Sequence, residues 1–270
     1  MTDNPISEFE FAKYTEAGKK RKNEPNQDAI DVIEVENGNS KTILLIIADG
    51  MGGHKDGATA SRIVVETTSA IYRQTGQSLE YEKILPYCLH MSHKMMRTYA
   101  STSPNSNNMG STAVIAALVH NNIYVANVGD SRAYLLRGRE IRQLSFDHSL
   151  VGELVRTGAL TNMEASKHPA RNRLTQSISV QRQTITPFFI RAELLPNDIV
   201  LLCTDGLWGV VSEAVIQAVA LELPPKQATQ KLAALANANQ GPDNISVIIA
   251  RYKPKGKQNI VGENVDETKP

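Results

Sequence analysis

Residues 42–53 read TILLIIADGMGG, and this stretch sets the interpretation of the whole chain. The apolar run at 42–48 is typical of a strand buried on both faces, because it lacks the alternation of a half-exposed strand. The glycines that follow it are expected to end the strand. Asp49 therefore stands beside a buried strand, where a carboxylate is costly unless it is paired or bound to a metal.

The segments on either side contain strands in runs and helices in pairs. Strands with alternating polarity are predicted before the apolar run, at 9–17 and 29–35, and helices after it, at 57–73 and 79–100. This arrangement favours an α+β layered sandwich over a parallel, doubly wound sheet. The remaining predicted elements are strands at 111–120, 123–127, 133–136, 141–144, 188–194, 199–204 and 245–252, and helices at 213–221 and 226–237.

The composition excludes several classes of protein. With 29 Lys and Arg against 28 Asp and Glu in 270 residues, the chain lacks the basic excess of a nucleic-acid-binding protein. No apolar run approaches the roughly 18–20 residues of a membrane-spanning helix, and the polar N-terminus is not a secretory signal. Cys88 and Cys203 form neither a disulfide framework nor a zinc spacing. We expect a cytoplasmic monomer with one domain at 1–252 and a disordered tail at 253–270.

Four aspartates share one sequence context: each lies beside Gly or Asn where an apolar strand begins or ends. They are Asp49, Asp130, Asp205 and Asp243. For any one of them, ordinary turn chemistry is a sufficient explanation. Four in the same context favour carboxylates that meet at one rim of a sheet and bind a metal. Oxygen ligands without a Cys or His cluster suit magnesium or manganese rather than zinc.

Seven short motifs occur in a fixed order along the chain. They are NQDA (26–29), ADGMGGH (48–54), GST (110–112), NVGDSRAYL (127–135), DHSL (147–150), CTDGLWG (203–209) and GPDNISVI (241–248). As an ordered set, they resemble the metal-dependent type-2C protein serine/threonine phosphatases, in the bacterial form, over residues 9–252. The resemblance implies a four-layer sandwich of two antiparallel sheets flanked by helices. It also implies a signalling enzyme that acts on phosphorylated proteins, with a serine/threonine kinase as its counterpart.

The resemblance further implies a core site with two Mg²⁺ or Mn²⁺ ions and a third ion beside it. By similarity, Asp49 would bridge the two core ions, and the Gly50 carbonyl would complete the coordination of one. Asp205 and Asp243 would hold the first ion. Asp130, together with Asp205, would hold the third.

Asp28 matches an acidic position that contacts the second ion through water. The residue before it is Gln27, where the more acidic version of this block has Glu. Two divalent ions would lower the pKa of a shared water, and the bridging hydroxide would attack phosphoserine or phosphothreonine without a covalent intermediate. Cys203 is interpreted as core packing rather than as a nucleophile.

The phosphate-binding arginine of the family stands in an R-x-x-N-x-D arrangement, but here Asn23 occupies the arginine position. A two-residue insertion, Glu24-Pro25, would leave Arg21 in the phosphate-binding and catalytic role. Lys20 or Lys22 could substitute for it, and a solvated basic run is the alternative without function.

Other departures concern proton transfer and substrate choice. Met51 stands where animal members of the family place a histidine. The group that protonates the leaving oxygen is therefore either His54 or a metal-bound water. The irregular stretch 147–179 corresponds to the family's variable flap, in which Gln176 replaces a common arginine. Two alternative functions are an inactive relative that binds phosphoproteins and a phosphatase for small molecules. Retention of the four aspartates speaks against the inactive relative.

Overall fold

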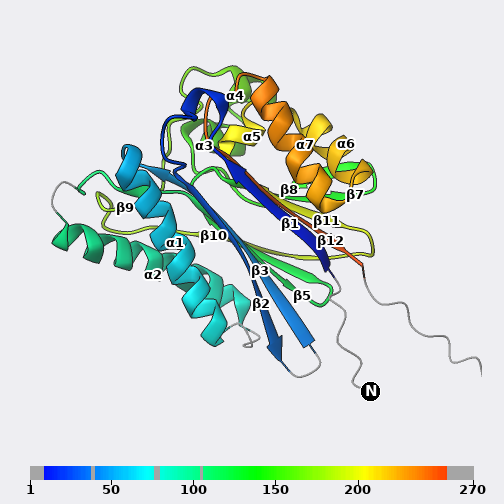
Figure 1. Ribbon diagram of the computed structural model, residues 1–270, viewed down its shortest axis with the longest axis horizontal. Coiled ribbons are helices and arrows are strands. Elements are labelled where there is room, and N and C mark those ends of the chain that lie inside the picture. The colour runs from blue at the N-terminus through cyan, green and yellow to red at the C-terminus, as the bar shows by residue number, and fades with distance from the viewer. Residues whose placement is uncertain (1–8, 38–39, 76–79, 104–105, 254–270) are drawn as a thin grey trace, which may run out of the picture.

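The computed structural model describes residues 9–37, 40–75, 80–103 and 106–253. They form four layers, with two β-sheets packed face to face and helices on both outer sides (Figure 1). Every strand pairing within the sheets is antiparallel. The predicted α+β sandwich of two antiparallel sheets with flanking helices is confirmed.

The first sheet has the order β10-β6-β5-β3-β4-β9, with β2 paired to β3. Its strands are β2 (Asp28–Asn37), β3 (Ser40–Met51), β4 (Gly110–Ser111), β5 (Ala113–Val119), β6 (Asn122–Val128), β9 (Ile178–Ser179) and β10 (Phe188–Glu193). The second sheet has the order β1-β12-β11-β7-β8. Its strands are β1 (Phe9–Glu16), β7 (Arg132–Arg137), β8 (Glu140–Gln143), β11 (Ile199–Cys203) and β12 (Ile245–Tyr252).

Helices α1 (His54–Thr75) and α2 (Tyr81–Thr102) cover the first sheet, and α6 (Glu213–Glu222) and α7 (Pro225–Ala238) cover the second (Figure 1). Two short helices, α3 (Leu150–Arg156) and α4 (Asn162–Lys167), lie between β8 and β9. The four-residue helix α5 (Asp205–Trp208) follows β11 directly, and the 3-10 helix η1 (Lys19–Arg21) follows β1.

Strand β3 explains why the apolar run 42–48 has no polar alternation. Ile43, Leu45 and Ile47 belong to the core between the two sheets. Leu44 and Ile46 belong to a separate core that the first sheet forms with α1 and α2. Because both faces of the strand are buried, every position from Ile43 to Ala48 is apolar.

Several local expectations were wrong at their boundaries. Strand β3 does not end at Asp49, because Gly50 and Met51 pair with the short strand β4. Helix α1 begins at His54, three residues earlier than expected, and the irregular stretch 147–179 contains α3 and α4. The expected start of α2 near Leu79 and the tail beyond Lys253 lie outside the described residues.

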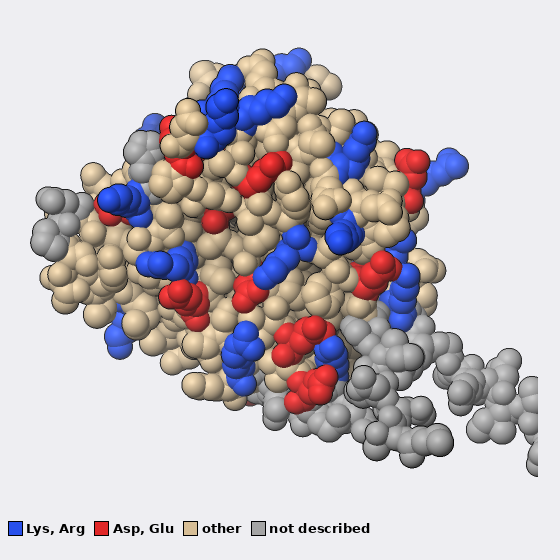
Figure 2. All heavy atoms as spheres, viewed as in Figure 1, with Lys and Arg blue, Asp and Glu red and all other residues tan. Residues whose placement is uncertain are grey.

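Cys88 and Cys203 are both buried in apolar cores, as predicted. Within the described ranges, no helix is long and apolar enough to cross a membrane. On the face shown in Figure 2, acidic and basic side chains are interspersed over most of the surface.

Candidate metal centre

The predicted metal-binding aspartates lie where the ends of the two sheets meet. Asp28 opens β2 and stands directly opposite Asp49 in the β2–β3 ladder. Asp205 begins α5 at the end of β11, and Asp243 precedes β12, the neighbour of β11 in the second sheet. Asp130 precedes β7, which pairs with β11 on its other side. Five chain segments thus bring five carboxylates to one region.

These carboxylates act on one another electrostatically. The pKa of Asp49 is raised well above its usual range, first by burial and then by the charges of Asp28, Asp205, Asp130 and Asp243. Such mutual repulsion makes the ionised forms costly in the absence of a counter-charge. The cluster is therefore poised to accept cations.

Asp28 is held firmly through only one of its two oxygens. Its Oδ2 accepts hydrogen bonds from Ser246 Oγ at 2.6 Å and from Thr204 Oγ1 at 3.0 Å. Its Oδ1 is buried and has no hydrogen-bond partner, and the same is true of Asp205 Oδ1. A buried carboxylate oxygen without a donor is costly, and a metal ion or its water would satisfy it. The donor chemistry therefore fits a divalent cation.

The side chains do not form a ready-made cage. Among the described residues, no three His, Cys, Asp or Glu side chains are arranged so that they could hold one ion by themselves. Direct ligation of one ion by Asp49, Asp205 and Asp243 together therefore stays a prediction. Magnesium commonly keeps several waters and uses few protein ligands, so an incomplete side-chain set is compatible with it.

Close backbone packing fixes the segments that carry these residues. A Cβ at Gly50 would lie 1.9 Å from the carbonyl oxygen of Gly57 in α1, so only glycine fits there. A Cβ at Gly206 would lie 1.8 Å from the carbonyl oxygen of Asn244. The glycine after Asp49 and the glycine after Asp205 therefore allow α1 and the segment before β12 to close on the site.

Arg21 is the basic residue of the 19–22 run that reaches the acidic cluster. Its Nη2 lies 3.4 Å from Asp243 Oδ2, and its Nη1 donates to Glu24 Oε2 at 3.0 Å. Lys20 donates instead to Gln240, and Lys22 is exposed. Glu24 belongs to the predicted two-residue insertion, so the insertion itself orients the guanidinium. This geometry supports Arg21 over its lysine neighbours as the phosphate ligand.

A comparison with known families identifies the family to which this fold belongs. The family model described as Protein phosphatase 2C matches residues 17–240. The chain belongs to the protein phosphatase 2C family. It is a protein serine/threonine phosphatase.

Relatives of this 2C phosphatase agree over most of its length. It is 36% identical over 216 residues to the serine/threonine phosphatase stp of Listeria innocua, covering 77% of this chain and 84% of the relative. The crystal structure of the serine/threonine phosphatase Stp1 from Staphylococcus aureus is similar with a TM-score of 0.81 and 31% identity, covering 92% and 96% of the two chains. The catalytic domain of the phosphatase PstP in complex with two manganese ions has a TM-score of 0.77 and 26% identity, covering 90% and 97%.

In this 2C phosphatase, His148 joins the Asp130 turn to the flap. The ring Nδ1 of His148 accepts a hydrogen bond from the Gly129 backbone N–H at 3.2 Å, and the backbone N–H of His148 donates to the Gly129 carbonyl at 2.9 Å. Its carbonyl accepts from the Thr175 N–H at 2.8 Å, on the other stem of the flap. The flap stems and the Asp130 turn therefore share one hydrogen-bonded unit, with His148 at its centre.

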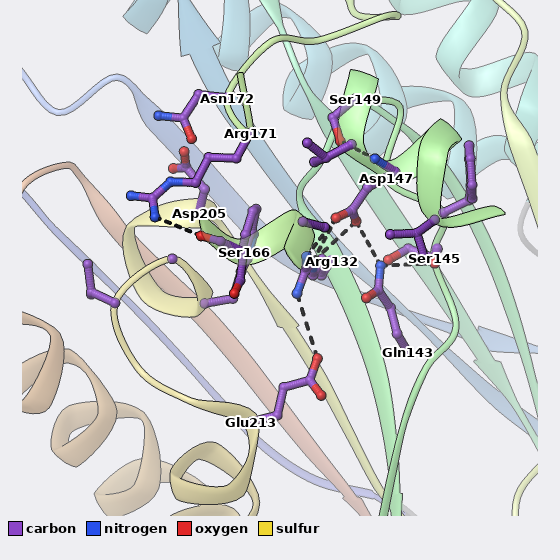
Figure 3. A pocket seen from close by; sticks show the side chains of 18 of the residues that line it. Arg132, Gln143, Ser145, Asp147, Ser149, Ser166, Arg171, Asn172, Asp205 and Glu213 are labelled. Carbon is purple, nitrogen blue, oxygen red and sulfur yellow. Dashed lines mark hydrogen bonds and ion pairs between the residues drawn. The ribbon is translucent and has the colours of Figure 1, made fainter. Parts of the chain in front are cut away.

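Sequence reasoning missed the hydroxyls that hold Asp28. Thr204 precedes Asp205, and Ser246 interrupts the apolar strand β12. Ser246 is fully buried, and a lone serine inside an otherwise apolar strand was the available signal. Sequence reasoning also missed the ion pair between Arg132 and Asp147, at 2.7 Å, which lies in the cavity of Figure 3.

Proposed function

We propose that this phosphatase hydrolyses phosphoserine and phosphothreonine esters of proteins by direct attack of water, with divalent metal ions and without a phosphorylated enzyme intermediate. The observation that carries the proposal is the convergence of five carboxylates, two of which have a buried, unpartnered oxygen. The manganese-bound PstP structure supports the choice of metal. We propose Mg²⁺ or Mn²⁺ for this chain.

The proposed ligands follow from where the side chains lie. Asp49 is central, because the charges of the other four aspartates act on it. Asp205 and Asp243 would share the first ion with Asp49 and the Gly50 carbonyl. Asp28 would act on the second ion through water, since one of its oxygens is engaged by hydroxyls. Asp130 would share a third ion with Asp205. When bound, these ions would lower the pKa of the attacking water and screen the phosphate charge.

Arg21 would bind the phosphate. Its guanidinium is planar and carries paired donors that match phosphate oxygens, and it lies beside Asp243 at the edge of the cluster. In the bound state, the phosphate would compete with Asp243 and Glu24 for its donors. Arg21 therefore orients the phosphate for attack.

A covalent route through Cys203 is disfavoured by its surroundings. The thiol is fully buried in β11, and burial raises its pKa far above the usual range. A thiol in that state provides no thiolate nucleophile. This supports direct attack by water on the phosphoester. We further propose that a serine/threonine kinase generates the substrates.

The test of the proposed function is phosphate release from a phosphothreonine peptide, with and without chelator. We expect turnover with Mn²⁺ or Mg²⁺, loss of at least about 99% of it with excess EDTA, and recovery when the metal is restored in excess. Hydrolysis that persists in EDTA would contradict metal dependence. Binding of the peptide without turnover in metal would favour the inactive-relative function.

Metal binding should also stabilise the fold in a pH-dependent way. Without metal, burial raises the pKa of Asp205 to about 6, Asp28 to about 7 and Asp130 to about 8, against 3.8 for an ordinary Asp. Because the unfolded chain releases these protons more readily, the metal-free protein should lose stability as pH rises through this range. A cation binds the ionised form and offsets that loss, by about 2.7 kcal/mol at 100 times its Kd.

We therefore expect Mn²⁺ to raise the thermal midpoint more at about pH 8 than at about pH 6, in scanning fluorimetry. Metal-free samples, prepared with chelator, give the baseline. An equal shift at both pH values, or no shift, would show that these carboxylates do not bind the ion.

A further inference from the structure

A cavity of about 730 Å³ lies between the flap and the helices that follow β11 (Figure 3). This volume is within the roughly 300–1,000 Å³ of ligand sites in proteins. Asp205, Gly206 and Asp243 contribute to its lining, so it is continuous with the candidate metal centre. A group held in the cavity would lie next to a phosphate bound at that centre.

The flap side of the cavity carries an apolar patch beside polar residues such as Arg171 and Asn172. Val151 and Val155 of α3 and Met163 and Ala165 of α4 line it, and Val210 lines it from the segment after α5. Met163 is the large apolar side chain of the mostly polar helix α4, and it is 70% exposed. The structure therefore leaves this side chain uncovered. Methionine is flexible and polarisable, which suits a wall that closes over varied apolar groups.

Three polar residues in the wall of the cavity, Arg132, Gln143 and Asp147, already satisfy one another. Arg132 forms three hydrogen bonds of 2.7–3.2 Å with Asp147, and its guanidinium lies 3.7 Å from the ring centroid of Trp208. Gln143 donates to the same Asp147 at 2.7 Å. An apolar group that enters against this wall therefore leaves Arg132 and Asp147 paired, whereas a charged group there would find both counter-charges engaged.

We propose that this cavity is the docking pocket for a large apolar side chain of the phosphoprotein substrate. A chamber of this volume is roughly 9 Å across, and an extended chain rises about 3.3 Å per residue, so the apolar residue would lie within about three positions of the phosphorylated one. The inference rests on the proposed function and names the substrate class of that site.

The test compares phosphothreonine peptides that have Gly at the three positions on either side with peptides that carry Leu at one of them. For the wild-type enzyme, we expect kcat/KM for the best Leu peptide to exceed that for the Gly peptide by about tenfold, from burial of one apolar side chain. In Met163→Ser and Val155→Ser, this ratio should fall toward one. Val215→Ser, on the exposed face of α6 and outside the cavity, should keep the wild-type ratio.

The outcomes separate this inference from the function on which it rests. Equal rates for Leu and Gly peptides in the wild type, or an unchanged ratio in both cavity variants, would overturn the docking pocket and leave the phosphatase activity in place. A wild-type protein that hydrolyses neither these peptides nor p-nitrophenyl phosphate, with metal present, would overturn the proposed function and the pocket together.

Discussion

Replacement of Asp49 by Asn is expected to reduce hydrolysis of a phosphothreonine peptide by about a thousandfold or more, while the protein remains folded. The change keeps the shape of the side chain and removes one negative charge from the centre of the carboxylate cluster. Since the charges of four other aspartates act on Asp49, its loss should weaken metal binding more than a change at the periphery. Phosphate release at saturating Mn²⁺ measures the effect.

Two further measurements make the Asp49 result specific. The metal-free Asp49→Asn protein should be at least as stable as the wild type near neutral pH, because the substitution relieves like-charge repulsion. Its thermal midpoint should also respond less to Mn²⁺. Asp31→Asn, on the same strand pair but in a partly exposed ion pair with Lys13, is the matched control and should retain activity. Near-wild-type turnover by Asp49→Asn would rule out its role at the metal centre.

Replacement of Arg21 by Ala is expected to lower kcat/KM for the same peptide by about 10- to 100-fold, because the phosphate loses a paired, charged donor. Arg21→Lys should recover only part of the loss, since an ammonium group lacks the planar fork. Steady-state kinetics over a range of peptide concentrations measures both.

The neighbouring lysines provide internal controls for Arg21. Lys20 is engaged with Gln240 and Lys22 is exposed, so Lys20→Ala and Lys22→Ala should each change kcat/KM by less than about twofold. A larger loss in either lysine variant than in Arg21→Ala would transfer the phosphate-binding role to that lysine.

The long helices and strands could be predicted from the sequence because their pattern of apolar residues follows which faces are buried. The run at 43–48 is apolar throughout since both faces of β3 are buried, and the strand at 245–252 is mostly apolar for the same reason. Short elements carry too few residues for a period to be visible. Helix α5 has four residues and begins at Asp205, so its first residue was expected at a strand end.

The acidic residues of the site could be predicted from the sequence, but most of the side chains that hydrogen-bond to them could not. Asp28, Asp49, Asp130, Asp205 and Asp243 stand out because carboxylates beside apolar strands are unusual. Contacts that join distant segments leave no local pattern. The bonds from Thr204 and Ser246 to Asp28 span 176 and 218 residues of sequence, and the contacts of His148 link two stems of the flap.

The pairing of β1 with β12 has a consequence for how the enzyme is made. Phe9 faces Tyr252 in that ladder, and β12 also separates β1 from β11 in the second sheet. On a ribosome, the sheet cannot close until β12 has left the exit tunnel, and Asp243 arrives only just before it. Such long-range pairing slows folding. Nascent chains that end before β12 should therefore lack phosphatase activity.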